Sequence, residues 1–442
     1  MKKFATSFLC FAFALLPPFL TLCAGQDNKP AQLSGFDRDR AHSMLQMVAD
    51  DVRKHYYDPK FHGLDWNARV AEAKQKIDTS PNFNMALSHI AGALDALNDS
   101  HTFFLPPSRP YRHDFGYQTA MIGDRCFVLR VRPGSDGDTK GLKAGDEVLA
   151  INGFTPTRDS LWKMQYVFEA LRPQASLHLQ LRNPAGSDRP LEVVAKMQPL
   201  SQIKDLTSSN DIYELIRNSE DEDERMRTRW QELGDLFVLK ISRFFFTDSE
   251  AEEIIGHARK HKAMIVDLRG NGGGAVDSLQ SLLGRIFENE VKIADRVKRN
   301  DTKPFVAKSH RNPYTGKVVV LVDSQSASAS ELFARVVQLQ KRGVVIGDTS
   351  SGSVMESMHY NYQTGTQTIA FFGASITDAD LIMSDGVSLE HRGVVPDQTL
   401  LPTAADLAAN RDPVLAHAAE TLGYKMTPEE AGKLFPYQWS KQ

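Results

Sequence analysis

The spacing of hydrophobic residues divides the chain into three consecutive stretches. Between residues 36 and 108, apolar positions such as Ala86 and Ile90 recur three and four apart, which predicts a helical segment. Between 112 and 200, short apolar runs alternate with glycine-marked turns, which predicts a β-rich domain. Between 205 and 415, apolar runs of strand length alternate with helical spacing. The pattern therefore predicts a multidomain α/β protein.

The third stretch has the alternation of strands and helices that builds a mostly parallel sheet. Its strand-like runs are rich in Val, Ile and Leu and lie at 236–241, 263–268, 318–322 and 344–346. Helical spacing follows each of the first three. Such βα units are expected to form one sheet with helices on both faces. The last residues, 416–442, are expected to form a C-terminal tail.

The first 25 residues have the composition of a signal peptide. Lys2 and Lys3 precede an almost wholly apolar run over residues 4–22, and the small residues Ala24 and Gly25 come before a polar stretch. We therefore expect cleavage after one of these two small residues. The protein would then be exported, to the periplasm or out of the cell.

Two other interpretations of this N-terminal run are open. An uncleaved membrane anchor would use the same apolar residues, because the run approaches the length that spans a bilayer. Pro17 and Pro18 in its middle argue against an anchor. Lipid attachment to Cys23 is the other interpretation, and bulky Leu22 argues against it. No later segment is long and apolar enough to span a membrane, so no span is expected once the signal is removed.

Composition narrows the classes of function. The 442 residues carry a formal charge of -3, and the basic runs are short and mixed with acids, so no nucleic-acid partner is expected. Cys126 is the one cysteine beyond the signal, so no internal disulfide can form, and its strand-like surroundings predict a buried thiol. His257 and His261 have metal-compatible spacing, but flanking lysines and the lack of a third ligand favour a solvated helix end. No cofactor or metal is expected.

A serine-rich turn separates one predicted strand from the helix that follows it. It reads Ser-Ala-Ser-Ala-Ser-Glu over residues 326–331, with Ser328 in the middle. In α/β sheets, sites form where strands end and helix amides point outward, so a serine here can meet a ligand and the Ala329 amide can face an oxyanion. The structural alternative is a capping box, in which Ser328 caps the helix and Glu331 reaches back. Glu331 fits the cap, the site or both.

A glycine turn follows another predicted strand. It reads Asp-Leu-Arg-Gly-Asn-Gly-Gly-Gly over residues 267–274, and consecutive glycines let backbone amides approach a ligand closely. The formal match of Gly270-x-Gly272-x-x-Ala275 to a dinucleotide fingerprint is the rival interpretation. The position of the turn late in an exported chain argues against that rival.

The β-rich stretch resembles the second half of a PDZ domain. The resemblance rests on Pro-Gly-Ser at 133–135 and on Gly-Leu-Lys-Ala-Gly-Asp-Glu-Val-Leu-Ala-Ile-Asn-Gly at 141–153. It implies that Phe115, Gly116 and Tyr117 form a carboxylate-binding loop and that an extended peptide or C-terminus binds by strand addition. A sheet domain without a ligand is the alternative.

Together these motifs resemble the C-terminal processing and tricorn-like serine peptidases. The likeness covers nearly the whole mature chain, including Glu-His-Arg-Gly-Val-Val-Pro-Asp at 390–397 and Asp-Pro-Val-Leu at 412–415. It implies a ClpP/crotonase-like α/β catalytic core after the helical segment and the PDZ-like domain. It also implies that Ser328 is the nucleophile, with oxyanion donors from Ala329 and from Gly273 or Gly274.

The general base is where the sequence departs from the processing peptidases. They use a lysine in a Gly-Lys-Gly turn, and Ser353 stands at that position here. The tricorn-like branch instead uses a histidine preceded by serine, which Ser100 and His101 match. An imidazole titrates near neutral pH and can move the proton of serine. By resemblance, Glu390 is the acidic partner of His101 and Ser100 assists.

These features predict an exported serine endopeptidase that acts on protein or peptide substrates. The main alternative is a peptide-binding PDZ protein whose catalytic core has decayed, because the lysine is missing. A hydrolase of non-peptide esters or amides is a third class. The oligomeric state and the substrate are not predicted.

Overall fold

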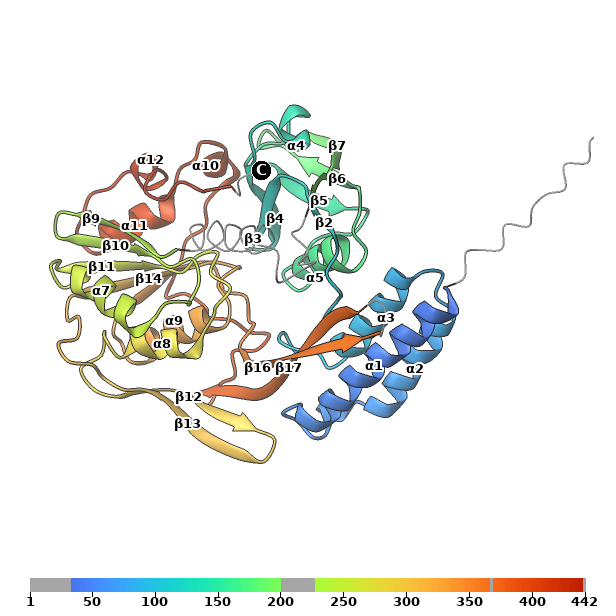
Figure 1. Ribbon diagram of the computed structural model, residues 1–442. Coiled ribbons are helices and arrows are strands. Elements are labelled where there is room, and N and C mark those ends of the chain that lie inside the picture. The colour runs from blue at the N-terminus through green and yellow to red at the C-terminus, as the bar shows by residue number, and fades with distance from the viewer. Residues whose placement is uncertain (1–32, 200–226, 366–368, 440–442) are drawn as a thin grey trace, which may run out of the picture.

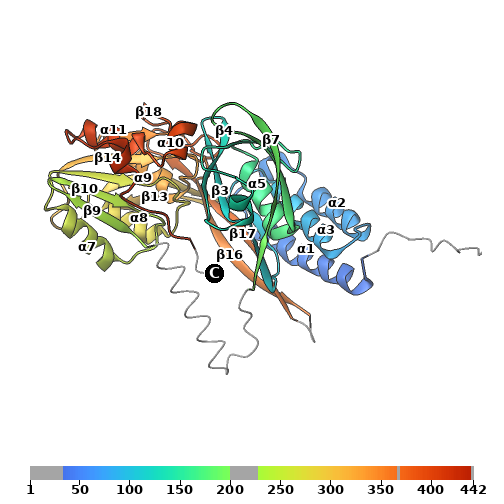
Figure 2. The same ribbon diagram turned by 90° about the horizontal axis from the view of Figure 1, so that it is seen from above.

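The computed structural model describes residues 33–199, 227–365 and 369–439. The predicted signal peptide, residues 1–25, lies outside the described residues. Figure 1 shows a helical bundle, a β-rich domain and an α/β core, and Figure 2 shows a long β-hairpin running between the core and the bundle. The mixed α/β multidomain architecture expected from the sequence is confirmed.

The N-terminal helices form a bundle with its own apolar core. They are α1 (Gly35–His55), α2 (Trp66–Asp78) and α3 (Phe83–Asp95), with the short helix η1 (Phe61–Gly63) between the first two. The side chains of Ser34, Asp65 and Asn82 each cap one helix by accepting a backbone N–H. The expected helical segment reached 108, but helix ends at Asp95, and β1 (Phe103–Leu105) pairs with a strand of the core. That strand pairing replaces the expected helix, while Phe104 still packs into the core of the bundle.

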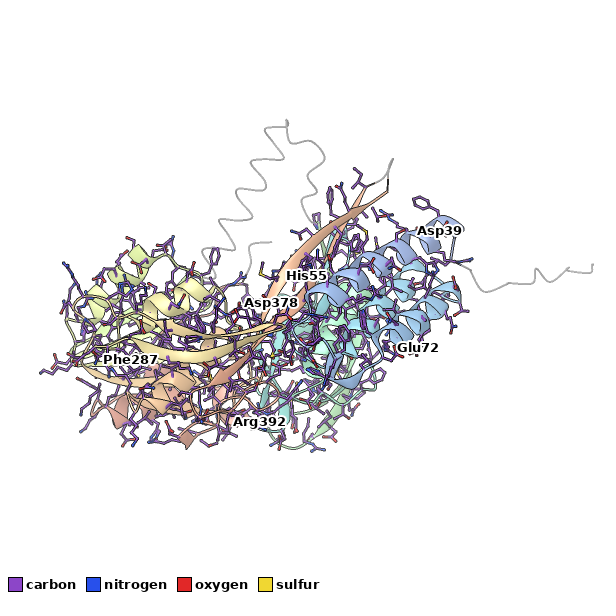
Figure 3. All side chains as sticks on the ribbon, turned by 90° about the horizontal axis from the view of Figure 1, so that it is seen from below. Asp39, His55, Glu72, Phe287, Asp378 and Arg392 are labelled. Atoms are coloured by element: carbon purple, nitrogen blue, oxygen red, sulfur yellow. The ribbon has the colours of Figure 1, made fainter. Side chains whose placement is uncertain are left out.

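A five-stranded antiparallel sheet connects the bundle to the core. It contains β1, β12 (Val291–Lys298), β13 (Asp301–Ala307), β16 (Met355–Thr364) and β17 (Ala370–Met383). Phe372, Ala374 and Ile376 of β17 pack into the core of the bundle. In Figure 3, His55 at the end of α1 and Asp378 of β17 lie at this junction. The hairpin therefore fixes the early helical region against the late α/β region.

The β-rich domain is a five-stranded antiparallel sheet. Its strands are β3 (Tyr117–Ile122), β4 (Arg125–Val131), β5 (Glu147–Ile151), β6 (Ser176–Arg182) and β7 (Asp188–Val194). Three short helices accompany them, α4 (Asp136–Thr139), α5 (Leu161–Gln165) and η2 (Tyr166–Leu171), and β2 (Tyr111–Asp114) pairs with β8 (Lys196–Pro199). Cys126 is buried in the apolar core of this domain, as predicted. The PDZ-like assignment stays a prediction.

The α/β core contains a six-stranded sheet in the order β18-β15-β14-β11-β10-β9. Its strands are β9 (Arg229–Leu233), β10 (Leu236–Lys240), β11 (Ala263–Asp267), β14 (Lys317–Val322), β15 (Val344–Gly347) and β18 (Gln398–Thr399). All neighbours pair in parallel except β9, as the βα pattern predicts. The resemblance of this core to ClpP or crotonase stays a prediction.

Helices cover both faces of that sheet (Figure 1). One face packs against α7 (Asp248–Ala258), α8 (Val276–Leu283) and α9 (Ala329–Leu339). The other packs against α11 (Pro413–Thr421) and α12 (Pro428–Ala431), with α10 (Ala404–Ala408) nearby. The expected boundary between core and tail at residue 415 falls inside α11, because Val414, Leu415 and Ala418 belong to the core. None of the helices that the structure describes combines the length and hydrophobicity needed to cross a membrane.

Candidate active site

Ser328 lies at a strained turn between β14 and α9. Its backbone has φ 54° and ψ -116°, a combination that a residue with a side chain rarely adopts. Such strain persists only where surrounding contacts hold it, and it is common where a nucleophile must be presented at a strand-to-helix turn. Ser328 is half-buried at the start of α9, with the favourable potential of the helix N-terminus beside it.

The glycine turn is fastened to the serine turn through Asn271, which is fully buried. Its carbonyl oxygen accepts the Ala327 N–H at 2.9 Å and the Ser330 hydroxyl at 3.0 Å. Its side-chain amide donates to Ile241 O at 2.9 Å. A Cβ at Gly273 would lie 2.7 Å from Ser328 Cβ, so only glycine lets the two turns approach this closely.

The predicted oxyanion donors differ in their availability. The Gly273 N–H already donates to Asn271 Oδ1 at 2.8 Å. The Gly274 and Ala329 amides donate no hydrogen bond to any residue that the structure describes. Gly274 has φ 147°, and a Cβ there would lie 2.1 Å from Phe244 O, so no side chain fits. The geometry therefore favours Gly274 over Gly273 as the partner of Ala329.

Glu331 is a buried carboxylate that holds the serine turn and the 350–353 loop together. One oxygen accepts the Ser350 hydroxyl at 2.6 Å and the Gly352 N–H at 2.8 Å. The other accepts the N–H groups of Ser353 and Ser328, both at 3.0 Å. Burial raises the pKa of Glu331 to about 7, and these four donors act in the opposite direction. Glu331 is thus both a helix cap and part of the site's framework.

Ser353, which stands where the processing peptidases have lysine, contributes its backbone. Its carbonyl oxygen accepts the Ser328 N–H at 2.8 Å, and its hydroxyl lies 3.0 Å from Ser351 Oγ. Lys240, at the end of β10, bonds instead to Asp267 and to the carbonyl of Arg269. A Ser–Lys dyad therefore has no lysine at the family position.

His101, Ser100 and Glu390 form a hydrogen-bonded row. The Ser100 hydroxyl lies 2.7 Å from His101 Nδ1 and donates to Glu390 Oε2 at 2.9 Å. The Ser100 N–H donates to Glu390 Oε1 at 2.6 Å. Because the hydroxyl has one proton and gives it to the carboxylate, Nδ1 must carry the proton shared with Ser100 Oγ. The Nε2 atom of His101 is then left with its lone pair.

The ionisation of this row suits a neutral imidazole. Burial lowers the pKa of His101 to about 4, with the nearby Asp99 acting in the opposite direction. Burial also raises the pKa of Glu390, while its hydrogen bonds from Val354 and Ser100 lower it. At neutral pH, His101 is therefore uncharged and able to accept a proton.

A backbone path joins this row to the serine turn. The Val354 N–H donates to Glu390 Oε2 at 2.8 Å, and the preceding residue, Ser353, accepts the Ser328 N–H. Residues from the early helical region and the late core thus meet in one network. Within the described chain, no hydrogen bond joins the side chains of His101 and Ser328.

Asp99 fixes the loop that carries His101. Its Oδ1 accepts the N–H groups of His101 at 3.0 Å and Thr102 at 2.7 Å, and the Thr377 hydroxyl at 2.6 Å. Its Oδ2 accepts the hydroxyl of Tyr56, which is fully buried. This carboxylate ties the end of α1 and strand β17 to the histidine loop.

The predicted carboxylate-binding loop lies away from this network. Phe115 and Tyr117, but not Gly116, line a cleft of about 1230 Å³ between the β-rich domain and the core. The cleft also contains Gly270 and Gly272 of the glycine turn but neither Ser328 nor His101. The Gly116 N–H donates to Asp114 Oδ1 at 2.9 Å, so that donor is already used in this structure.

Sequence reasoning missed two anchors of the site, Asn271 and Asp99, for which it predicted no role. Arg269 also braces the glycine turn, through paired bonds to Asp267 and to Asp412 at the start of α11. The described residues contain no group of three His, Cys, Asp or Glu that could hold a metal ion.

Comparison with known proteins shows which family the core resembles. Residues 235–400 match the family described as Peptidase family S41. The C-terminal processing peptidase of Tetradesmus obliquus chloroplasts is 23% identical over 369 residues, which cover 79% of this chain and 75% of that protein. The tail-specific protease of Haemophilus influenzae is 23% identical over 281 residues, 60% of this chain, and the chain spans only 38% of its length.

The fold is also similar to that of a solved structure. The crystal structure of mature CPAF superposes with a TM-score of 0.63 and 16% identity, covering 84% of this chain and 94% of that one. The resemblance to C-terminal processing peptidases, drawn from the sequence motifs, is thus confirmed. Residues 235–400 thus form a Peptidase family S41 region, and over most of its length the chain is similar to C-terminal processing peptidases.

Proposed function

We propose that the protein is an exported serine endopeptidase in which Ser328 attacks the peptide carbonyl and His101 is the general base. The observation that carries this proposal is the continuous network around Glu390. It reaches His101 through the Ser100 hydroxyl and the backbone of Ser328 through Val354 and Ser353. Two regions far apart in sequence are thereby joined in one hydrogen-bond network, which supports a shared site.

The proton path follows from the tautomer. His101 Nε2 takes the proton from Ser328 Oγ as the oxygen bonds to the carbonyl carbon, and the imidazole becomes a cation. The Nδ1–H group stays on the ring and donates a hydrogen bond to Ser100 Oγ, whose own proton is donated to the Glu390 carboxylate, and this row stabilises the cation. The imidazolium then protonates the leaving amine. Water, deprotonated by the same nitrogen, releases the acyl group from Ser328.

Negative charge on the carbonyl oxygen would be stabilised by the amides of Ala329 and Gly274. Both are free of other hydrogen bonds within the described chain, and Ala329 opens α9, so the helix dipole favours an anion there. Gly273 would contribute the space that brings its turn against Ser328.

Peptide recognition is assigned to the β-rich domain, residues 112–200, as a PDZ-like module. Phe115, Gly116 and Tyr117 would bind a chain end, and the cleft that Phe115 and Tyr117 line also contains Gly270 and Gly272 of the glycine turn. Displacement of the Asp114 side chain from the Gly116 N–H would free that donor for a carboxylate.

A fluorophosphonate probe tests the proposal, because it reacts covalently with an activated serine. We expect labelling of the wild-type protein, none of Ser328→Ala, and labelling of His101→Ala slowed by at least about a hundred-fold. Asn361→Ala, on an exposed strand, is the control and should label normally. Absence of labelling in the folded wild type would refute the hydrolytic proposal and favour a peptide-binding protein with a decayed core.

A further inference from the structure

The C-terminal segment crosses from the core to the β-rich domain. The residues that follow α12 first contact Arg229 of β9. The Arg229 guanidinium lies 5.6 Å from the ring centre of Phe435 and donates to Pro436 O at 3.0 Å. The chain then reaches β4 of the β-rich domain, where Tyr437 lies against Arg130. Residues 437–439 are therefore held by another domain than the one that anchors α12.

Two aromatic residues of this segment stack on two arginines. The Arg130 guanidinium lies 4.1 Å from the ring centre of Tyr437, and that of Arg132 lies 4.8 Å from the ring centre of Trp439. The two rings meet edge to face, 5.0 Å apart. Gln118, opposite Arg130 across the β3–β4 pair, donates to the Tyr437 hydroxyl. We call Gln118, Arg130 and Arg132 the arginine shelf.

Contacts within the β-rich domain hold the arginine shelf in place, and it lies beside the predicted carboxylate-binding loop. Arg132 is itself buried and forms an ion pair with Asp114 at 2.5 Å. The Arg132 N–H donates to Gly116 O at 2.7 Å. The shelf and the tail both line the cleft that contains the glycine turn. A peptide approaching that loop would meet the same surface.

The tail is held too loosely to be a core element. Tyr437 remains 42% exposed, and within the described residues its segment, 437–439, forms no backbone hydrogen bond to the β-rich domain. Spacing of two positions puts both rings on one side of an extended chain. Planar guanidinium groups stack on aromatic faces without needing a particular neighbouring sequence.

We propose that the arginine shelf binds two aromatic residues, two positions apart, of an extended peptide. Tyr437 and Trp439 occupy it as an intramolecular competitor. Being tethered, the tail has an effective concentration of roughly millimolar, so only ligands with favourable contacts elsewhere displace it. An effect of the tail on substrate turnover rests on the proposed peptidase function, whereas peptide binding to the arginine shelf does not.

Binding is tested in the Ser328→Ala protein, so that cleavage plays no part. The probe is a fluorescent synthetic peptide of residues 433–442, and its control carries alanine in place of both aromatics. Adding Tyr437→Ala and Trp439→Ala to the protein should tighten binding of the probe by about ten-fold or more, since the tethered competitor is removed. Further replacement of Arg130 by Ala should abolish that gain, and the control peptide should bind no more tightly in any variant.

The proposal is overturned if removing the two aromatics leaves probe binding unchanged, or if the control peptide binds as tightly as the probe. It is also overturned if sedimentation shows that the wild-type tail occupies the shelf of a second copy. With the catalytic serine intact, Tyr437→Ala/Trp439→Ala should raise kcat/KM for aromatic-ended peptides by a similar factor. Loss of all turnover with retained peptide binding would refute the peptidase function and leave the shelf intact.

Discussion

Replacing Glu331 by alanine tests whether one buried carboxylate holds the serine turn together. The change removes the acceptor for four donors. The Ser328 N–H still has Ser353 O as an acceptor, and the Ser350 hydroxyl can rotate toward another one. The Gly352 and Ser353 N–H groups lose the acceptor that Glu331 provides. Each buried donor left without a partner costs about 1–3 kcal/mol, so the free energy of unfolding should fall by about 4 kcal/mol.

The matched control is Glu250→Ala, which removes a glutamate at the same position of another capped helix, α7. Glu250 is exposed and serves only Thr247, so its loss should cost about 1 kcal/mol or less. Urea unfolding followed by circular dichroism measures both. Fluorophosphonate labelling should be lost in Glu331→Ala and kept in Glu250→Ala. If the two variants unfold within about 1 kcal/mol of each other and label equally, the reasoning about Glu331 is refuted.

Three further outcomes follow from the same geometry. Because burial lowers the pKa of His101 to about 4, its neutral form persists into acid, and the labelling rate should fall with a midpoint near pH 4; a midpoint near the ordinary value of 6.5 would contradict a buried base. Ser100→Ala should lower kcat by about ten- to a hundred-fold while the unfolding midpoint stays unchanged, because it cuts His101 from Glu390; unchanged kcat would argue against the row. Gly274→Ala should sharply reduce thermal stability, measured by calorimetry, since its Cβ would lie 2.1 Å from Phe244 O; a normal melting temperature would show that the turn can yield.

Much of the fold could be predicted because the local spacing of apolar residues determines its strands and helices. The runs at 236–241 and 263–268 became β10 and β11, since strands buried on both faces read as continuous apolar segments. The end of the helical segment could not be predicted as well. Residues 103–105 pair with β17, about 270 positions later, and no local signal announces a partner so distant.

The residues of the candidate site also differ in whether a local sequence pattern reveals them. Ser328, Gly273 and Gly274 stand out locally because strand-to-helix turns and glycine runs have sequence signatures. The tie of Ser100 to Glu390 spans 290 positions, and only the likeness to a known family suggested it. Asn271 and Asp99 carried no visible signal, because their roles lie in backbone groups that they meet only after folding.

The central claim is that His101 and Ser328 act on the same proton. A crystal structure of the protein with a fluorophosphonate bound to Ser328 would measure the distance between His101 Nε2 and Ser328 Oγ in a state that resembles the acylation intermediate. The account predicts about 3 Å, the length of a hydrogen bond, with Ser100 still bridging to Glu390. A distance beyond about 6 Å, with the phosphonate bound, would contradict it, because no proton could pass directly between the two groups.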